Sequence, residues 1–279
     1  MPEAPRKQGF WLLACGLFAG LTLFIGVVLL LKDNPIAEVV NNQQQFNEKT
    51  TQTSAASVTT QTSAALEAEV VYFDDLTGML CKPEGNGLPA VVYHHGGSGG
   101  AQIGGDLEGI CRALSAAGIV GFSPLRSSDL QSNEKEMQAA LDYLLQQSYV
   151  DGTNIGVIGF SRGAGSAYSL AIANTGEIRG MVLMSGGRPS ETNNFYRGAS
   201  VLEYPIQLMV AENDTPASFN GNQNMVEVME EIAALLEAEG VGVSLTIYPP
   251  YETNHGHMMF FEIGDYFGDV IDYLSRTFE

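Results

Sequence analysis

The chain has 279 residues, of which 45% are hydrophobic and 16% are charged, enough for one sizeable domain and an additional apolar segment. It carries 13 Lys and Arg against 32 Asp and Glu, and most of this acidity lies after residue 67. A surface this negative repels phosphate backbones, whose affinity for proteins comes mainly from Lys and Arg, so nucleic acid is a poor candidate partner.

Residues 9–31 form an apolar run without a charged side chain, GFWLLACGLFAGLTLFIGVVLLL. As a helix the run would reach roughly 34 Å at about 1.5 Å per residue, which is long enough to cross a hydrocarbon core. Arg6 and Lys7 precede it, and this charge bias places the N-terminus in the cytoplasm. We therefore predict a single-pass membrane anchor over residues 1–31, with the remainder of the chain extracytoplasmic. Cleavage as a signal peptide, or as a lipoprotein at Cys15, stays open as an alternative.

Residues 32–67 are rich in Gln, Thr, Ser, Asn and Ala and almost lack large apolar side chains. Such a segment cannot bury enough surface to offset the entropy lost on ordering. We predict a disordered linker here, followed by a catalytic domain over residues 68–279.

Short apolar runs alternate with helical patterns throughout this predicted domain. The first two runs, Val70–Phe73 and Met79–Lys82, are typical of a hairpin. Buried strands are predicted at Ala90–His94, Ile119–Ser123, Ile155–Phe160, Met181–Ser185, Ile206–Ala211 and Val243–Tyr248, and helices at Leu107–Ala117, Glu134–Gln147, Ala164–Asn174, Met225–Glu239 and Tyr266–Phe278. The alternation predicts an α/β fold with a mostly parallel sheet, helices on both faces, and ligands beyond the C-terminal ends of the strands.

The sequence GFSRG at residues 159–163 is a GxSxG motif that follows one predicted strand directly and opens the next predicted helix. This is the strand-turn-helix context in which the motif carries a nucleophile. A serine in so sharp a turn takes a strained backbone conformation, and the flanking glycines avoid a clash. The turn then exposes the hydroxyl at the positive end of the helix. We predict that Ser161 is the nucleophile.

A serine hydroxyl is a weak nucleophile at neutral pH and needs an adjacent base, which a third group holds in place. In enzymes with this motif the chain order is nucleophile, acid, histidine, so the base is expected to be His255 or His257. The acid is expected on the loop after the strand at residues 206–211. Asp214 is the predicted acid, with Glu212 as the alternative.

Acyl transfer also needs backbone N–H donors for the oxyanion of the transition state. One predicted donor is the N–H of Arg162, the residue after the nucleophile. The second is expected from the sequence HHGGSGG at residues 94–100, because glycines let the backbone approach a ligand closely. We predict Gly97 as this donor, and we expect His94 and His95 to brace the loop.

Four segments, VVYHHGGSGG, IGVIGFSRGAG, LMVAENDTP and YPPYETNHGHMMF, resemble the oxyanion, nucleophile, acid and histidine blocks of the dienelactone-hydrolase-like branch of the α/β-hydrolases. The resemblance covers about residues 70–278 and implies an α/β-hydrolase fold and a serine hydrolase that cleaves carboxylic esters. In related sequences the catalytic histidine commonly follows a glycine and precedes an aromatic residue, as His257 follows Gly256. The resemblance therefore implies His257 as the base, with His255 as the alternative base.

Two departures from the family pattern bear on the substrate. Dienelactone hydrolases proper use a cysteine nucleophile and hold an acidic lactone with arginines, whereas this chain has Ser161 and, after the histidine, the apolar run Met258–Phe261. An uncharged acyl ester is therefore expected. The segment at residues 186–205 is too short for a lid of several helices, which favours an open site for short-chain or polymer-end esters.

Three other functions compete with this interpretation. A serine peptidase of the prolyl-oligopeptidase type has a similar catalytic domain, but no propeller or other gating domain is recognisable in these 279 residues. A non-catalytic binding protein could retain the fold, and the intact Ser, Asp and His set argues against it. A metal site of the four histidines with Glu252 lacks a metal-binding spacing such as HExxH. The predicted triad requires neither a cofactor nor a metal.

Two cysteines, Cys81 and Cys111, fall in the predicted domain. A disulfide between them is possible outside the cytoplasm, but the sequence does not place them within bonding distance. Because cysteine is among the most buried residue types, the sequence favours two buried free thiols.

Overall fold

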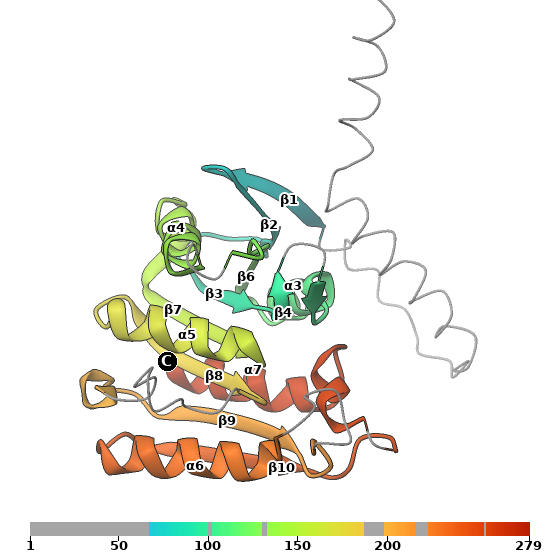
Figure 1. Cartoon of the computed structure of the whole chain (residues 1–279). Coiled ribbons are helices and arrows are strands. Elements are labelled where there is room, and N and C mark those ends of the chain that lie inside the picture. The colour runs from blue at the N-terminus through green and yellow to red at the C-terminus, as the bar shows by residue number, and fades with distance from the viewer. Residues whose placement is uncertain (1–66, 100–101, 130–132, 187–197, 216–222, 254) are drawn as a thin grey trace, which may run out of the picture. The chain divides into compact units, whose positions relative to one another are not determined.

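The computed structural model describes residues 67–99, 102–129, 133–186, 198–215, 223–253 and 255–279 (Figure 1). All of them lie within one compact unit, Thr59–Glu279. The predicted membrane anchor and nearly all of the predicted linker lie outside the described residues. Within the described residues, no helix is both long and apolar enough to cross a membrane.

The described elements alternate between strands and helices, as the sequence predicts. The strands are β1 (Ala68–Phe73), β2 (Leu76–Cys81), β3 (Leu88–His94), β4 (Gly96–Gly99), β5 (Gln102–Gly104), β6 (Val120–Pro124), β7 (Val150–Phe160), β8 (Ile178–Met184), β9 (Ile206–Ala211) and β10 (Val243–Tyr248). The helices are α3 (Leu107–Ala116), α4 (Asn133–Leu145), α5 (Arg162–Ala173), α6 (Met225–Ala238) and α7 (Tyr266–Phe278), with 3₁₀ turns η1 (Ala199–Val201) and η2 (Gly256–Phe260).

The main sheet of the described residues has eight strands in the order β1-β2-β6-β3-β7-β8-β9-β10. Strand β2 runs antiparallel to both of its neighbours, and every pair from β6 to β10 is parallel. The chain therefore crosses over repeatedly, and the C-terminal ends of β3, β7, β8 and β9 meet at one edge. This arrangement is the predicted α/β-hydrolase fold.

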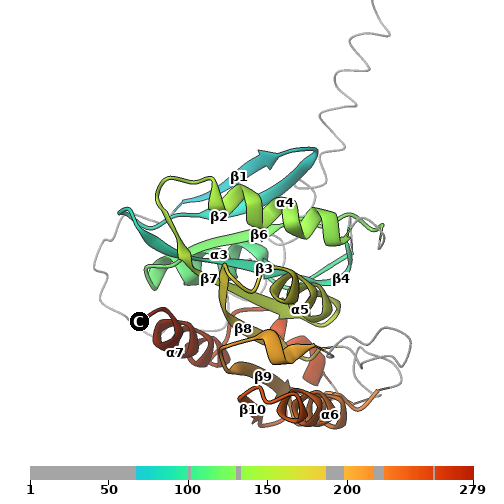
Figure 2. The ribbon, with the colours of Figure 1, turned by 90° about the vertical axis from the view of Figure 1, so that its left-hand side faces the viewer.

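Helices cover both faces of this sheet. Figure 2, which views the sheet from its side, shows α4, α5 and α6 on one face and α3 and α7 on the other. Alternate residues of one strand accordingly enter different cores: Val92 of β3 packs with the α4–α5–α6 side, whereas Val91 packs with the α3–α7 side. Because strands buried on both faces need no polar side, they read as continuous apolar runs in the sequence.

The glycine-rich segment after β3 is more ordered than the sequence predicts. The sequence predicts a loop here, but the structure has a two-stranded antiparallel sheet of β4 and β5, in which Gly96 pairs with Gly104. The prediction was wrong because glycine has a low strand propensity. Strand β4 forms through its backbone pairing with β5, which the local sequence does not indicate.

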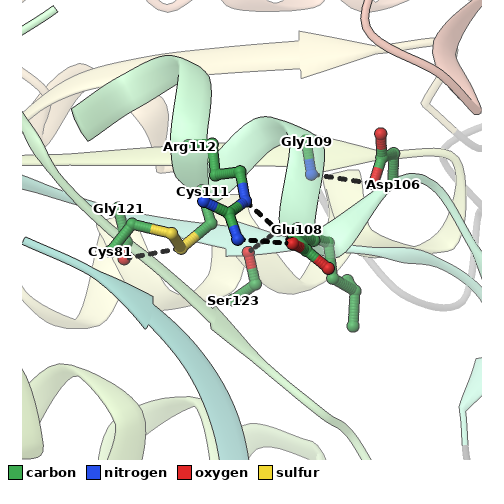
Figure 3. Close-up of a disulfide and its surroundings, with 9 residues drawn as sticks. Cys81, Asp106, Glu108, Gly109, Cys111, Arg112, Gly121 and Ser123 are labelled. Carbon is green, nitrogen blue, oxygen red and sulfur yellow. Dashed lines mark hydrogen bonds and ion pairs between the residues drawn. A yellow bond between two sulfur atoms is a disulfide. The ribbon is translucent and has the colours of Figure 1, made fainter. Parts of the chain in front are cut away.

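Cys81 and Cys111 form a disulfide, so the prediction of two free thiols was wrong (Figure 3). Cys81 is the last residue of β2 and Cys111 lies in the middle of α3, with a Cα–Cα distance of 5.3 Å. The sequence could not reveal this proximity because it arises from the packing of α3 against β2, which are far apart in the chain. Both side chains are fully buried.

Candidate active site

Ser161 lies at the turn between β7 and α5, at the C-terminal edge of the sheet. Its backbone has φ 52° and ψ −119°, in the region that L residues rarely adopt. The Ser161 N–H donates to the carbonyl of Met184 at 2.8 Å, which ties this turn to the end of the neighbouring strand β8. The side chain is partly exposed. The predicted nucleophile therefore sits in the sharp strand-to-helix turn that the motif implies.

The glycines on either side of Ser161 make this turn possible. A Cβ built on Gly159 would lie 2.5 Å from the Cα of Ala164, and one on Gly163 would overlap the carbonyl oxygen of His94. The turn thus leaves room for hydrogen alone at both positions. The GxSxG motif therefore has glycine at the two positions where any side chain would clash with neighbouring backbone.

His257 connects Ser161 to Asp214. Its Nε2 is 3.1 Å from Ser161 Oγ, and its Nδ1 is 2.8 Å from Asp214 Oδ2. Asp214 is fully buried and His257 is only 2% exposed, so the pair is shielded from water. The structure thus brings together three of the predicted site residues with hydrogen-bonding distances at both junctions.

The loops that carry the acid and the histidine pack directly on each other. A Cβ built on Gly256 would overlap the backbone N of Asp214, so only glycine permits this approach. Asn213 links the same two loops: its amide nitrogen donates to the carbonyls of Tyr251 and Glu252 at 2.9 and 2.7 Å, and its Oδ1 accepts from the N–H of Tyr251. Sequence reasoning missed Asn213, whose only signal is its place beside the predicted acid.

Among the described residues, Ser161 is hydrogen-bonded to His257 and not to His255, the alternative base. Its side chain is 60% exposed, and its Nδ1 is 3.3 Å from Glu252 Oε2. His255 precedes the 3₁₀ turn η2, whereas His257 lies inside that turn and is carried into the fold with Phe260. Glu212, the alternative acid, is exposed.

Aromatic rings surround the His257 imidazole. The Phe160 ring is 5.0 Å from it and the Phe261 ring 6.4 Å, measured between centroids, and the two phenylalanines contact each other at 5.3 Å. Phe261 also reaches the β4–β5 hairpin, since a Cβ built on Gly104 would lie 3.2 Å from its Cζ. The imidazole therefore packs against apolar rings on the side of Phe160 and Phe261.

The two predicted oxyanion donors lie on elements that adjoin Ser161. Arg162 is the first residue of α5, where backbone N–H groups have no partner within the helix. Gly97 lies in β4 with φ 73°. A Cβ built on its neighbour Gly96 would lie 3.2 Å from the Cβ of Ser161, so β4 begins directly against the nucleophile.

His94 and His95 are both fully buried, and the positively charged Arg126 lies beside them. Burial is the larger cause and the charge of Arg126 the second, and together they lower the pKa of each histidine to about 3. Arg126 is itself buried. Its pKa is lowered to about 10, mainly by this burial and second by the charge of Arg162. Sequence reasoning missed Arg126, because nothing in its local sequence marks it. Among the described residues no group of three or more His, Cys, Asp and Glu could hold a metal ion.

Fold and site geometry together define an α/β hydrolase. The sequence profile of the dienelactone hydrolase family matches residues 121–260, half of the chain. The chain belongs to the dienelactone hydrolase family, and at the level of the family it is an enzyme that hydrolyses esters. A comparison with curated proteins finds no match.

Solved structures share this fold at low sequence identity. A dienelactone hydrolase-like promiscuous phosphotriesterase, P91, from metagenomic libraries is 18% identical, with 77% of this chain and all of that chain covered and a TM-score of 0.58. EstE1, a thermostable carboxylesterase from a metagenomic library, is 18% identical over 78% of this chain and 90% of that one, with a TM-score of 0.57. A putative dipeptidyl aminopeptidase IV from Bacteroides ovatus is 14% identical over 76% of this chain but 35% of that one, with a TM-score of 0.54. At these identities the likeness shows the fold alone.

Proposed function

We propose that the protein is a serine hydrolase that cleaves carboxylic esters with Ser161 as nucleophile, His257 as general base and Asp214 as the group that orients the histidine. The observation that carries the proposal is the pair of distances at His257, 3.1 Å from Nε2 to Ser161 Oγ and 2.8 Å from Nδ1 to Asp214 Oδ2. In this arrangement Asp214 accepts from Nδ1–H, which leaves the Nε2 lone pair facing the hydroxyl.

The reaction proceeds in two steps, acylation of Ser161 and hydrolysis of the acyl-enzyme. Ser161 Oγ attacks the acyl carbon while its proton passes to His257 Nε2, and the N–H groups of Gly97 and Arg162 bind the oxyanion. The oxyanion then collapses, the alcohol leaves with the proton from Nε2, and an acyl-enzyme remains. Water gives a proton to Nε2 and attacks the acyl carbon, and the carboxylic acid is released as Ser161 regains its proton.

The preferred substrate is an uncharged ester with a short acyl chain or at the end of a polymer. The apolar rings of Phe160 and Phe261 beside His257 support this, because they offer no partner to an acidic substrate. The segment expected to leave the site open, residues 186–205, lies largely outside the described residues.

The hydrolase domain acts outside the cytoplasm, held by the anchor at residues 1–31. The apolar run and its flanking charges support this placement. The Cys81–Cys111 disulfide supports it independently, because such bonds persist in oxidising compartments and are rare in the cytosol.

Replacing Ser161 by Ala tests the nucleophile. Hydrolysis of p-nitrophenyl butyrate should fall by about a thousandfold or more, and labelling by a fluorophosphonate probe should disappear. Ser169→Ala, a serine on the same helix α5, is the matched control and should retain wild-type rates. A Ser161→Ala protein that keeps more than a tenth of the activity would refute the assignment.

The same assay separates the competing functions. A serine peptidase would cleave aminoacyl p-nitroanilides faster than the ester, and a non-catalytic protein would neither cleave the ester nor react with the probe. We expect ester cleavage to dominate by at least tenfold.

A further inference from the structure

His95 lies outside the triad and is nevertheless held by three hydrogen bonds. Its Nδ1 is 2.6 Å from the carbonyl oxygen of Gly96, and its Nε2 is 3.3 Å from the backbone N of Arg126. The guanidinium of Arg126 donates from Nη2 to the carbonyl oxygen of His95 itself. A buried ring with a defined partner at each nitrogen is fixed in orientation.

These partners determine which nitrogen of His95 carries the proton. The backbone N–H of Arg126 can only donate, so Nε2 accepts. The Gly96 carbonyl can only accept, so Nδ1 carries the proton and donates. Burial and the adjacent Arg126 charge lower the pKa of His95 to about 3, which keeps the ring neutral at the pH where a serine hydrolase works.

The Gly96 carbonyl and the Gly97 N–H belong to the same peptide group. That group is planar and, like all peptide bonds of the described residues, trans, so its C=O and N–H point in opposite directions. Fixing the oxygen on the His95 ring therefore fixes the direction of the Gly97 N–H. A hydrogen bond accepted at the oxygen also polarises the group and strengthens its N–H as a donor.

The position of this peptide group relates it to the nucleophile. Gly96 is packed against Ser161, since a Cβ built on it would lie 3.2 Å from the serine Cβ. On the other side, a Cβ on Gly104 of β5 would lie 3.2 Å from the Gly97 nitrogen. The peptide group, which belongs to β4, thus lies between Ser161 and Gly104 of the neighbouring strand β5.

We propose that His95 is a positioning residue for ester hydrolysis: its Nδ1–H holds and polarises the Gly96–Gly97 peptide group, so that the Gly97 N–H is oriented for the oxyanion before substrate binds. Arg126 holds the imidazole from the other side. The inference rests on the proposed function, because this N–H matters only if Ser161 attacks an acyl carbon.

Substitution of His95 by asparagine or by glutamine tests the roles of its two ring nitrogens separately. The side-chain nitrogen of asparagine occupies about the position of Nδ1, whereas the amide of glutamine reaches about the position of Nε2. His95→Asn therefore keeps a donor to Gly96, and His95→Gln keeps a partner for Arg126 only. In the full-length protein in detergent, His95→Gln should lower kcat for p-nitrophenyl butyrate by about ten- to a hundredfold with KM within about threefold, since one oxyanion donor contributes about 10² to 10³ in kcat.

The asparagine variant should stay within about fivefold of wild-type kcat. The inhibition constant of a trifluoromethyl ketone, which forms a tetrahedral adduct with serine, should rise in the glutamine variant in parallel with the loss of kcat. His255→Gln, at an exposed histidine, is the matched control and should change neither value. Equal effects of the two His95 substitutions, or a rise in KM alone, would overturn the proposal.

A measurement on the wild-type protein covers the case in which a variant does not fold. With ¹⁵N-labelled histidine, long-range ¹⁵N–¹H spectra should show His95 as the neutral Nδ1–H tautomer between pH 5 and 8. The Nε2–H tautomer or a protonated ring would overturn the proposal. Failure of the proposed function itself has a different signature, namely Ser161→Ala with wild-type activity.

Discussion

At the scale of single residues, two histidines separated by one glycine have opposite environments. His257 is 2% exposed and lies between Ser161 and Asp214, whereas His255 is exposed beside Glu252. The difference arises at Gly256, whose missing side chain lets the backbone contact the acid loop and turn the next residue inward. The same absence of a side chain at Gly159 and Gly163 shapes the nucleophile turn.

This contrast predicts the outcome of two alanine substitutions. His257→Ala should lower kcat by about a thousandfold or more, because it removes the proposed base that accepts the serine proton. His255→Ala should remain within about threefold of wild type, since its exposed ring pairs with the exposed carboxylate of Glu252 and not with Ser161. Steady-state rates on p-nitrophenyl butyrate measure both. An inactive His255→Ala protein beside an active His257→Ala protein would show that the assignment is reversed.

The buried pair His94 and His95 predicts loss of stability in acid. Both have a folded-state pKa of about 3 against 6.5 in the unfolded chain. The unfolded state therefore takes up protons that the folded state does not, so stability is complete above pH 6.5 and declines as pH falls from 6.5 towards 3. His95→Asn removes one of these two sites. Between pH 5.5 and 4, the free energy of unfolding of this variant should fall by about 1.4 kcal/mol less per pH unit than that of the wild-type protein. Urea unfolding at several pH values tests this, and identical slopes would contradict it.

At the scale of elements, periodicity and chain order predict most of what positions the site. Strand β9, helix α7 and the turn at Ser161 lie where the sequence places them, because apolar runs and a GxSxG motif are local signals. Contacts between distant segments have no such signal. The disulfide, the pairing of β4 with β5 and the bond from Arg126 to His95 all depend on how elements pack together, so the sequence alone could not predict them.

The disulfide that joins β2 to α3 predicts a measurable stabilisation. It closes a loop with a sequence separation of 30 residues. In the chain-entropy account, a loop of this length corresponds to about 3–4 kcal/mol. The double substitution of Cys81 and Cys111 by Ala should lower the free energy of unfolding by about this amount and abolish the effect of reductant on the melting temperature. If reductant leaves wild-type melting unchanged, the two thiols are not bonded in the protein as isolated.

At the scale of the whole molecule, the acidic charge agrees with the proposed placement of the hydrolase domain in aqueous solvent outside the cytoplasm. After residue 67 there are nine Lys and Arg against 27 Asp and Glu, which favours solubility of the hydrolase domain. The positive side chains Arg6 and Lys7 instead precede the apolar run at residues 9–31. This charge distribution supports the proposed arrangement, in which the N-terminal run lies in a membrane and the hydrolase domain in the aqueous phase.

This asymmetry predicts both attachment and orientation. The full-length protein should remain in the membrane pellet after carbonate extraction, and protease added to cells without their outer layers should release the hydrolase domain by cutting within residues 32–67. The double substitution Leu23→Arg and Phe24→Arg places two charges near the middle of the run. Each costs about 2.5–3.5 kcal/mol on insertion, so this variant should appear in the soluble fraction with its esterase activity intact. Leu23→Ile with Phe24→Leu is the matched control and should stay in the pellet. If carbonate extracts the wild-type protein from the membrane, the protein has no anchor. If the protein stays anchored but protease added from outside does not cut it, its orientation is the opposite of the one proposed.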